Sequence, residues 1–298
     1  MSSTLTVLQE KKSPIKAVAT TLRRFWKTAP LAFIGGAILT ILIFVAVFGN
    51  FIAPESYKKT DYLQIRDAPS LKRPLGSDHL GRDALSRIII GSRTSLFIAF
   101  SAVAISKLIG VSWGILSGYS GGKFDLLSQR LLDILMAIPS VIFALLLLAA
   151  LGAGVFGVIV AITIGGIAGT TRIVRSVVLA VKEMEFVTAA YALGASPLRI
   201  MIRHVAPQTI APVLVIISAS LGGAIFAESA LSFLGLGIPP PNPSWGAMLG
   251  GTLAEAFKPP WWMVVYPGVA ITLSILAFNL FGDGLRDTLD PRLRGRLE

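Results

Sequence analysis

Two short stretches near the middle of the chain contain residue types that are found in chemically active sites. Residues 118–122 read Gly-Tyr-Ser-Gly-Gly, the GxSxG spacing that presents a nucleophilic serine in α/β-hydrolases. Residues 121–124 read Gly-Gly-Lys-Phe and approach the GxxxxGK[ST] loop that holds the phosphates of a nucleotide. The first motif would indicate acyl hydrolysis, and the second would indicate ATP binding.

Neither motif has the groups that its chemistry needs. The serine follows a long apolar run instead of a strand, and His79 and His204 are the only histidines that could serve as its base. Ser117 stands where the nucleotide loop requires its first glycine, and Phe124 stands where a hydroxyl must hold magnesium. We therefore predict a turn at residues 118–122, no catalytic residue, and no ATP or magnesium held by this chain.

The composition indicates a membrane protein. Hydrophobic residues make up 54% of the 298 and charged residues 14%, whereas about a quarter of the residues in soluble domains are charged. The absence of cysteine excludes disulfides and iron–sulfur clusters, and two histidines are too few for a His-rich metal site. The net charge of +11 is therefore interpreted first as a signal of membrane topology, and no nucleic-acid partner is predicted.

Six apolar runs are long enough to cross a bilayer, whose core of about 30 Å needs about 20 helical residues. They are Leu31–Ala53, Ser95–Gly118, Ile134–Leu151, Val155–Thr171, Ala211–Leu236 and Met263–Phe281. The predicted fold class is an all-α integral membrane protein with six transmembrane helices. A cleaved signal peptide is a poorer interpretation of residues 1–53, because the apolar run is too long and no A-x-A-like site follows it.

The placement of cations predicts that both ends of the chain lie in the cytoplasm. The tail of residues 1–30 and the tail of residues 284–298 carry Lys11, Lys12, Lys16, Arg23, Arg24, Lys27, Arg286, Arg292, Arg294 and Arg296. Residues 54–94 then form an external loop, although they include eight Lys or Arg. The amphipathic end of this loop, from Leu80 to Ile89, predicts a helix on the outer membrane surface. Residues 95–283 form a core with five spans.

A charged segment, residues 183–207, interrupts the apolar runs on the predicted cytoplasmic side. Gly194 can end one short helix with a left-handed residue, and Ser196 with Pro197 can begin another. The small side chains of the first helix would let it enter a groove of a partner protein, while Arg199 and Arg203 remain available for acidic groups. An ordinary connecting loop is the alternative.

Two charged residues fall inside the predicted spans. A charge in the middle of a membrane helix costs on the order of 3 kcal/mol, so Lys107 should face a cavity or a partner. Glu228 is the one carboxylate in the fifth span. We hypothesise either an ion pair between them or a Lys107 ammonium that faces a translocation path; a lysine that snorkels to an interface or contacts another subunit is the alternative.

Glycine and proline patterns add two expectations about packing. Gly110 with Gly114, and Gly165 with Gly169, have the spacing that lets membrane helices approach closely, although glycine enrichment in membrane helices would also explain them. Residues 235–262 are rich in proline and include Trp245, Trp261 and Trp262. We expect a rigid, non-helical external path that anchors at the headgroup level and forms the mouth for an external binding protein.

The 183–207 segment resembles the cytoplasmic EAA loop of ATP-binding cassette (ABC) importer permeases. The positions that match its pattern are Ala189, Ala190, Gly194 and Pro207; the positions that depart from it are Thr188, His204 and Ala206. Three longer blocks, residues 75–87, 228–249 and 277–292, resemble the second permease subunit of the dipeptide/oligopeptide branch. The external candidates Asp78, Arg82, Asp83 and Trp245 lie in the first two blocks.

This resemblance implies a type I importer permease fold with cytoplasmic coupling helices. It also implies a plasma (inner) membrane location in a bacterium or archaeon and a complex of this chain with a second homologous permease, two ABC ATPases that hold ATP and magnesium, and an external substrate-binding protein. Peptides are the expected substrates, while similar permeases serve nickel chelates, glutathione, opines and other small solutes. The coupling residues would include Thr188, Ser196 and Pro197 with the matched positions.

Two other classes of protein were weighed. A secondary carrier or channel usually has an internal repeat or several intramembrane acids, and this sequence shows no convincing repeat and one clearly buried acid. An intramembrane hydrolase lacks its catalytic groups here. Stable co-purification with an ATPase would favour the importer.

Overall fold

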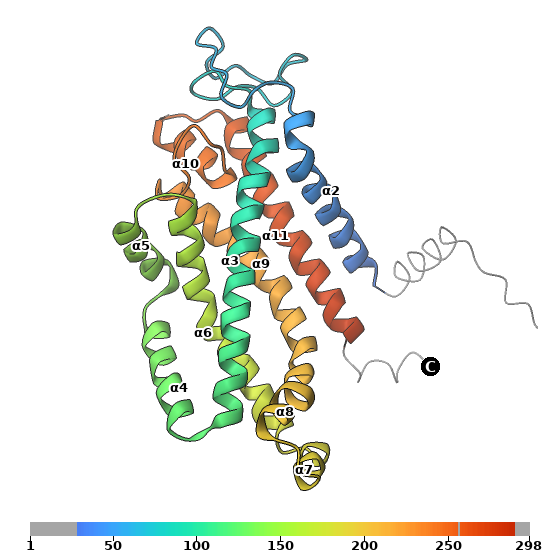
Figure 1. The fold of residues 1–298 in the computed structure, drawn as a ribbon. Helices are drawn as coiled ribbons and strands as arrows, with labels where there is room; N and C mark the ends of the chain where they lie inside the picture. Colours follow the sequence, from blue (N-terminus) through green and yellow to red (C-terminus); the bar gives the residue numbers. More distant parts are fainter. Residues whose placement is uncertain (1–28, 256, 290–298) are drawn as a thin grey trace, which may run out of the picture.

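The computed structural model describes residues 29–255 and 257–289, and this part of the chain is almost entirely helical (Figure 1). Most of the two predicted cytoplasmic tails lies outside these residues. The α-helices are α2 (Pro30–Ile52), α3 (Ala84–Ser120), α4 (Gly122–Ala137), α5 (Ser140–Leu151), α6 (Val155–Val181), α7 (Glu185–Ala192), α8 (Pro197–Ile200), α9 (Ile210–Phe233), α10 (Trp245–Glu255) and α11 (Trp261–Leu289).

Within the described residues, five continuous segments of helix have the length and apolarity of membrane spans. Four of them are α2, α3, α6 and α11, and the fifth is the continuous run from α8 to the end of α9. The third predicted span, Ile134–Leu151, is wrong as a single helix, because α4 and α5 meet at an angle of 89°. Pro139 explains the break: it follows Ile138 in an extended conformation, and proline disfavours helical geometry in the residue before it. The pair α4–α5 is either a broken span or a re-entrant loop.

The predicted helix on the outer membrane surface is also wrong. Residues 84–94 are the first turns of α3, which continues without a break for 37 residues, about 55 Å at roughly 1.5 Å per residue. Asp83 caps this helix, since its carboxylate accepts hydrogen bonds from the backbone N–H (2.7 Å) and the hydroxyl (2.6 Å) of Ser86. The apolar face of these turns is buried by protein.

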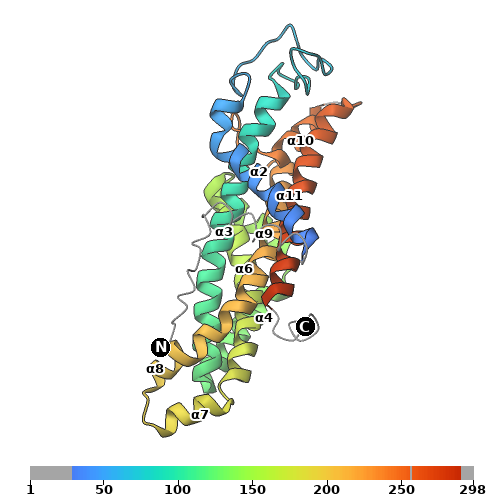
Figure 2. The ribbon, with the colours of Figure 1, turned by 90° about the vertical axis from the view of Figure 1, so that its right-hand side faces the viewer.

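The helices form an elongated bundle with different features at its two ends (Figures 1 and 2). The loop between α2 and α3 covers one end, and α7 with α8 projects at the other. The largest core cluster joins α2, α3, α9, α10 and α11 through Leu39, Ala46, Leu96, Ala99, Val103, Leu221, Ala224, Ile225, Trp245, Ala277 and Phe278. Predicted external and coupling segments are thus separated by the length of the bundle.

Helix α3 packs closely against α6 through its glycines. A Cβ atom on Gly110 would lie 2.8 Å from the Thr170 Cβ, and one on Gly114 would lie 2.7 Å from the Thr171 carbonyl oxygen. This half of the packing expectation is confirmed. Gly165 and Gly169 have no atom within 4 Å of such a Cβ, so the other predicted pair does not serve this interface.

The proline-rich segment after α9 is only partly non-helical. Residues 235–244 follow an irregular path, but the next residues form α10, which corrects the expectation of a non-helical segment throughout. Ser244 begins this helix by accepting a hydrogen bond from the Ala247 N–H at 3.3 Å. The prolines stand before and after α10 and none lies inside it, so the helix is permitted.

Candidate functional site

The 183–207 segment has the predicted helix–turn–helix start. Helix α7 ends before Gly194, whose φ of +81° is the left-handed conformation expected of a glycine cap. Ser196 then caps α8, because its Oγ accepts a hydrogen bond from the Arg199 N–H at 3.4 Å, and Pro197 occupies the first helical turn. The backbone geometry predicted for this turn is confirmed.

The sequence predicted a separate second helix in this segment, but the structure shows that this helix is continuous with α9. Helix α8 continues through one turn of π-helix, Met201–Val205, and one of 3₁₀-helix, Ala206–Thr209, directly into α9. Pro207 lies in the 3₁₀ turn, where a residue without an N–H is tolerated because the α-helical bonding is already interrupted. Because no loop separates α8 from α9, a displacement of α8 would also move the start of α9.

One face of the segment is anchored, and the rest is accessible. Val187, Ile200 and Val205 are buried against the valines at the end of α6. Ala190 is half-buried, and the other candidate residues are exposed: Thr188, Ala189, Gly194, Ser196, Pro197, Arg199, Arg203 and Pro207. The sequence reasoning missed an exposed apolar group, Tyr191, Leu193 and Leu198, of which Leu193 is 89% exposed. Large apolar side chains beside a helix-joining glycine were the available signal.

Lys107 is buried inside the helix bundle. Its Nζ donates a hydrogen bond to Thr170 Oγ1 at 2.7 Å, so this lysine does not snorkel to an interface. It lines a cavity of about 320 Å³ between α3, α5, α6 and α9, together with Ser106, Ser140, Gly166, Ser220 and Gly223. The buried Ser106 Oγ has no hydrogen-bond partner in the described part of the chain. The cavity therefore presents one cation together with the hydroxyls of Ser106, Ser140 and Ser220.

Glu228 does not pair with Lys107, so the ion-pair hypothesis is wrong. Its carboxylate is completely buried and accepts a hydrogen bond from Ser232 Oγ at 2.8 Å. Other hydroxyls beside it come from Ser95, Ser229 and Ser244. Ser95 of α3 lies beside Glu228, and Lys107 follows Ser95 by 12 residues on the same helix. Lys107 is therefore about 18 Å further along the helix axis than Glu228, at roughly 1.5 Å per residue. The serines of three elements solvate Glu228 instead.

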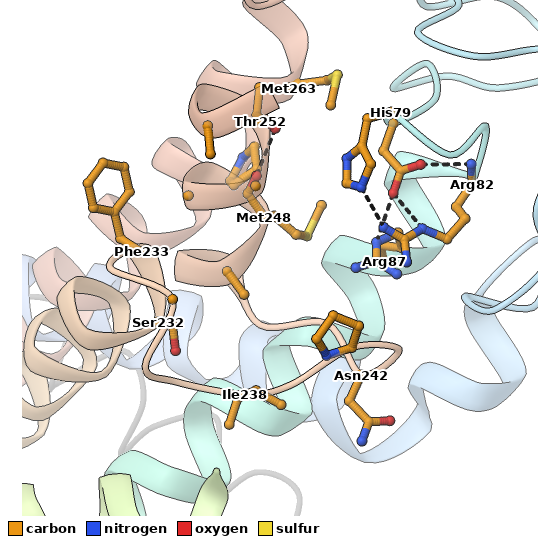
Figure 3. A pocket seen from close by; sticks show the side chains of 18 of the residues that line it. His79, Arg82, Arg87, Ser232, Phe233, Ile238, Asn242, Met248, Thr252 and Met263 are labelled. Atoms are coloured by element: carbon orange, nitrogen blue, oxygen red, sulfur yellow. Dashed lines mark hydrogen bonds and ion pairs between the residues drawn. The ribbon is translucent and has the colours of Figure 1, made fainter. Parts of the chain in front are cut away.

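A compact charge cluster lies at the N-terminal end of α3. Arg82 Nε donates to Asp78 Oδ2 at 2.7 Å, and Arg87 Nε lies 3.4 Å from the same oxygen (Figure 3). Asp83 is the cap of α3 and is not an open binding group. Trp245 is buried, and its indole N–H donates to the carbonyl oxygen of Ile88 at 3.1 Å. Asp78 and Arg82 thus face a common cavity, while Asp83 and Trp245 hold the surrounding backbone.

The GxSxG stretch is only partly the predicted turn, because residues 118–120 are the last of α3 and the chain turns at Gly121 and Gly122. It joins α3 to α4, and Gly121 and Gly122 have φ values of +63° and +59°. Asp125 after the turn accepts hydrogen bonds from Arg175 Nε at 2.6 Å and from Ser117 Oγ. These contacts fasten the start of α4 to α3 and α6, so this stretch has a structural role.

Comparisons with known proteins identify the family. Residues 110–295 match the binding-protein-dependent transport system inner membrane component, and residues 19–72 match the N-terminal TM domain of oligopeptide transport permease C. The chain belongs to this family of inner-membrane permeases. It is a multi-pass permease subunit of an ABC importer and not an enzyme.

Individual relatives refine this assignment to the oligopeptide branch. The glutathione transport system permease protein GsiD of Escherichia coli O1:K1 is 40% identical over 282 residues, which are 93% of each chain. The oligopeptide transport system permease protein OppC of Bacillus subtilis strain 168 is 39% identical over 90% of this chain and 88% of its own. The resemblance to the second permease subunit of this branch is confirmed.

A solved structure supports the fold. An inward-facing structure of the MetNI methionine ABC transporter contains a chain that matches 68% of this one and 96% of its own length, with a TM-score of 0.57 and 16% identity. This likeness confirms the importer permease fold.

Proposed function

We propose that this subunit forms half of a pathway for short peptides, including modified peptides such as glutathione, that an external binding protein delivers. The observation that carries the proposal is nearly full-length similarity to permeases named for oligopeptide and for glutathione transport. Both substrates combine a peptide backbone with a terminal carboxylate. The cavity at Lys107 suits such solutes, because its cation and its serine hydroxyls can accompany a carboxylate along walls that are otherwise mostly apolar.

The partners in this proposal are a second homologous permease, two ABC ATPases that hold ATP and magnesium, and the binding protein. The exposed face of α7 and α8 is the proposed ATPase contact, since Tyr191, Leu193 and Leu198 offer apolar anchors beside Arg199 and Arg203. Such a contact can do work only if it differs between the states of the ATPase. A partner that pulls α8 would move the base of α9, because the two are continuous.

In this proposal α7, α8 and both chain ends lie in the cytoplasm. This orientation is supported by the cations of the two tails. The outer loop also holds many cations, but three of them, Arg73, Arg82 and Arg87, are buried beside Glu55 or Asp78. Three of the loop's eight Lys or Arg residues are therefore held inside the protein, where they count less toward its orientation.

Uptake by the reconstituted importer tests the substrate class. Proteoliposomes that contain the complete complex and internal ATP should accumulate a radiolabelled dipeptide or glutathione when the binding protein is added outside. Vesicles without ATP are the control. Accumulation of a nickel chelate with no uptake of either peptide would contradict the proposal.

Lys107 is the proposed intramembrane contact for the substrate carboxylate. Replacing it with methionine keeps most of the length of the side chain and removes its charge. Since hydrogen bonds to charged groups contribute about 1.5–3 kcal/mol, uptake of a peptide acid should fall by about tenfold to a hundredfold. Lys123→Gln, an exposed lysine at the start of α4, is the matched control and should change little. Unaltered uptake by Lys107→Met would exclude the contact.

A further inference from the structure

A second cavity, of about 450 Å³, opens at the outer end of the molecule (Figure 3). It lies between the start of α3, the loop after α9, α10 and the start of α11. Its size falls within the range of small-molecule sites, roughly 300–1,000 Å³. One wall is charged and the other is apolar, so the cavity is suited to an amphipathic solute.

The charged wall contains more positive than negative charge. Asp78 faces two guanidinium groups, those of Arg82 and Arg87, each only 6% exposed. Its Oδ1 already accepts the backbone N–H groups of Leu80 and Arg82, both at 2.9 Å. Among the Asp and Arg residues that line the cavity, one carboxylate thus faces two guanidinium groups, and this excess of one positive charge favours the approach of an anion.

Arg87 is the second guanidinium of this wall, and backbone carbonyl oxygens hold it in place. Its Nη1 donates to the carbonyl oxygens of Tyr57 and Pro241, at 3.2 and 3.4 Å, and these contacts fix the guanidinium at the cavity wall. Its buried Nε has no hydrogen-bond partner in the described part of the chain, although Asp78 Oδ2 is 3.4 Å away. A guanidinium held in place at a cavity wall presents a fixed fork of donors and is suited to binding a carboxylate.

The opposite wall is apolar. It includes Phe233, Met248 and Met263, which come from the end of α9, from α10 and from α11. These side chains can receive an apolar group whose carboxylate lies at Arg87. The guanidiniums lie inside a concavity and are nine-tenths buried, so the arrangement favours a small carboxylate over an acidic side chain on the flat surface of another protein.

We propose that this outer cavity is an entry site that binds the terminal carboxylate of a short peptide at Arg87 and Arg82, with the peptide's last side chain against Met248 and Met263. The site would receive the solute before it enters the bundle toward Lys107. This proposal rests on the proposed function and adds a second binding position to it.

Photolabelling of the complete permease–ATPase complex in phosphatidylcholine nanodiscs tests the site. The probe is the dipeptide alanyl-p-benzoylphenylalanine, because benzophenones react readily with methionine side chains. Peptide mass spectrometry should locate the label at Met248 or Met263. Alanyl-phenylalanine should displace it, and alanyl-phenylalanine amide should not. Arg87→Gln should reduce labelling by about tenfold or more, whereas Arg93→Gln, an exposed arginine on the same helix, should not.

The comparison of acid and amide on the unaltered complex keeps the test decisive even if Arg87→Gln fails to assemble. Equal displacement by the two would overturn the proposal, and so would a label elsewhere in the chain. A label displaced by phosphatidylglycerol but not by the dipeptide would assign the cavity to a lipid headgroup and would also overturn it. ATP-driven dipeptide uptake without labelling here would defeat this inference and leave the proposed function standing.

Discussion

Replacing Gly194 with valine is expected to lower ATP-driven uptake by about five- to thirtyfold while the chain still inserts and assembles. The glycine joins α7 to α8 with a φ of +81°, and an added Cβ would meet no atom within 4 Å. The effect therefore comes from the backbone, where an L-residue in the left-handed region costs roughly 1–2 kcal/mol, most for a β-branched one. The turn would relax and displace α7 from α8.

Gly194→Asn is the matched control for this prediction. Asparagine is larger than glycine but tolerates the left-handed conformation, so it should retain most of the uptake. The measurement is peptide accumulated per ATP hydrolysed in proteoliposomes. Equal ratios for the valine and wild-type proteins would show that the geometry of this turn does not transmit energy.

Gly114→Val is expected to destabilise the bundle itself. A Cβ at this position would lie 2.7 Å from the Thr171 carbonyl oxygen and 2.8 Å from the Val174 Cβ, and backbone cannot move aside as a flexible side chain can. Overpacking of this kind costs about 1–3 kcal/mol. Membrane helices associate mainly through close packing, so separation of α3 from α6 is not offset by a hydrophobic gain.

Thermal melting of the purified complex, followed by fluorescence-detected size exclusion, measures this effect. Gly114→Val should lower the midpoint and the yield of assembled complex. Ser112→Val adds a comparable side chain on the exposed face of the same helix and should leave both near wild type. An equal midpoint for the two variants would mean that α3 and α6 do not need their close approach.

The features that the sequence predicts best are those set by residues adjacent to one another in the chain. Gly194 and Ser196 lie next to the helix ends that they form, so their roles could be inferred without knowledge of the fold. The five long spans follow from apolar length in the same way. Pro139 was a local signal for the α4–α5 break, but the span Ile134–Leu151 was predicted from apolar length alone, which does not take account of a proline.

The errors arose where distant segments decide the outcome. Residues 84–94 resemble a surface helix because they are amphipathic, yet Trp245, about 150 positions away, covers their inner face. The sequence allowed an ion pair between Glu228 and Lys107, whereas in the structure Ser95 lies beside Glu228. The outer cluster could not be assembled from sequence either, because Arg87 bonds to the carbonyl oxygens of Tyr57 and Pro241.

The central claim is that the energy of ATP hydrolysis enters this subunit through the exposed end of α7. The most direct test incorporates p-benzoylphenylalanine in place of Leu193, which is 89% exposed, and irradiates the assembled importer. The same photoreactive residue in place of Leu63, 95% exposed in the outer loop, is the control. We predict an adduct with the ATPase subunit from position 193 and none from position 63. An assembled, active importer that gives no ATPase adduct from position 193, or gives one from position 63, would contradict the claim.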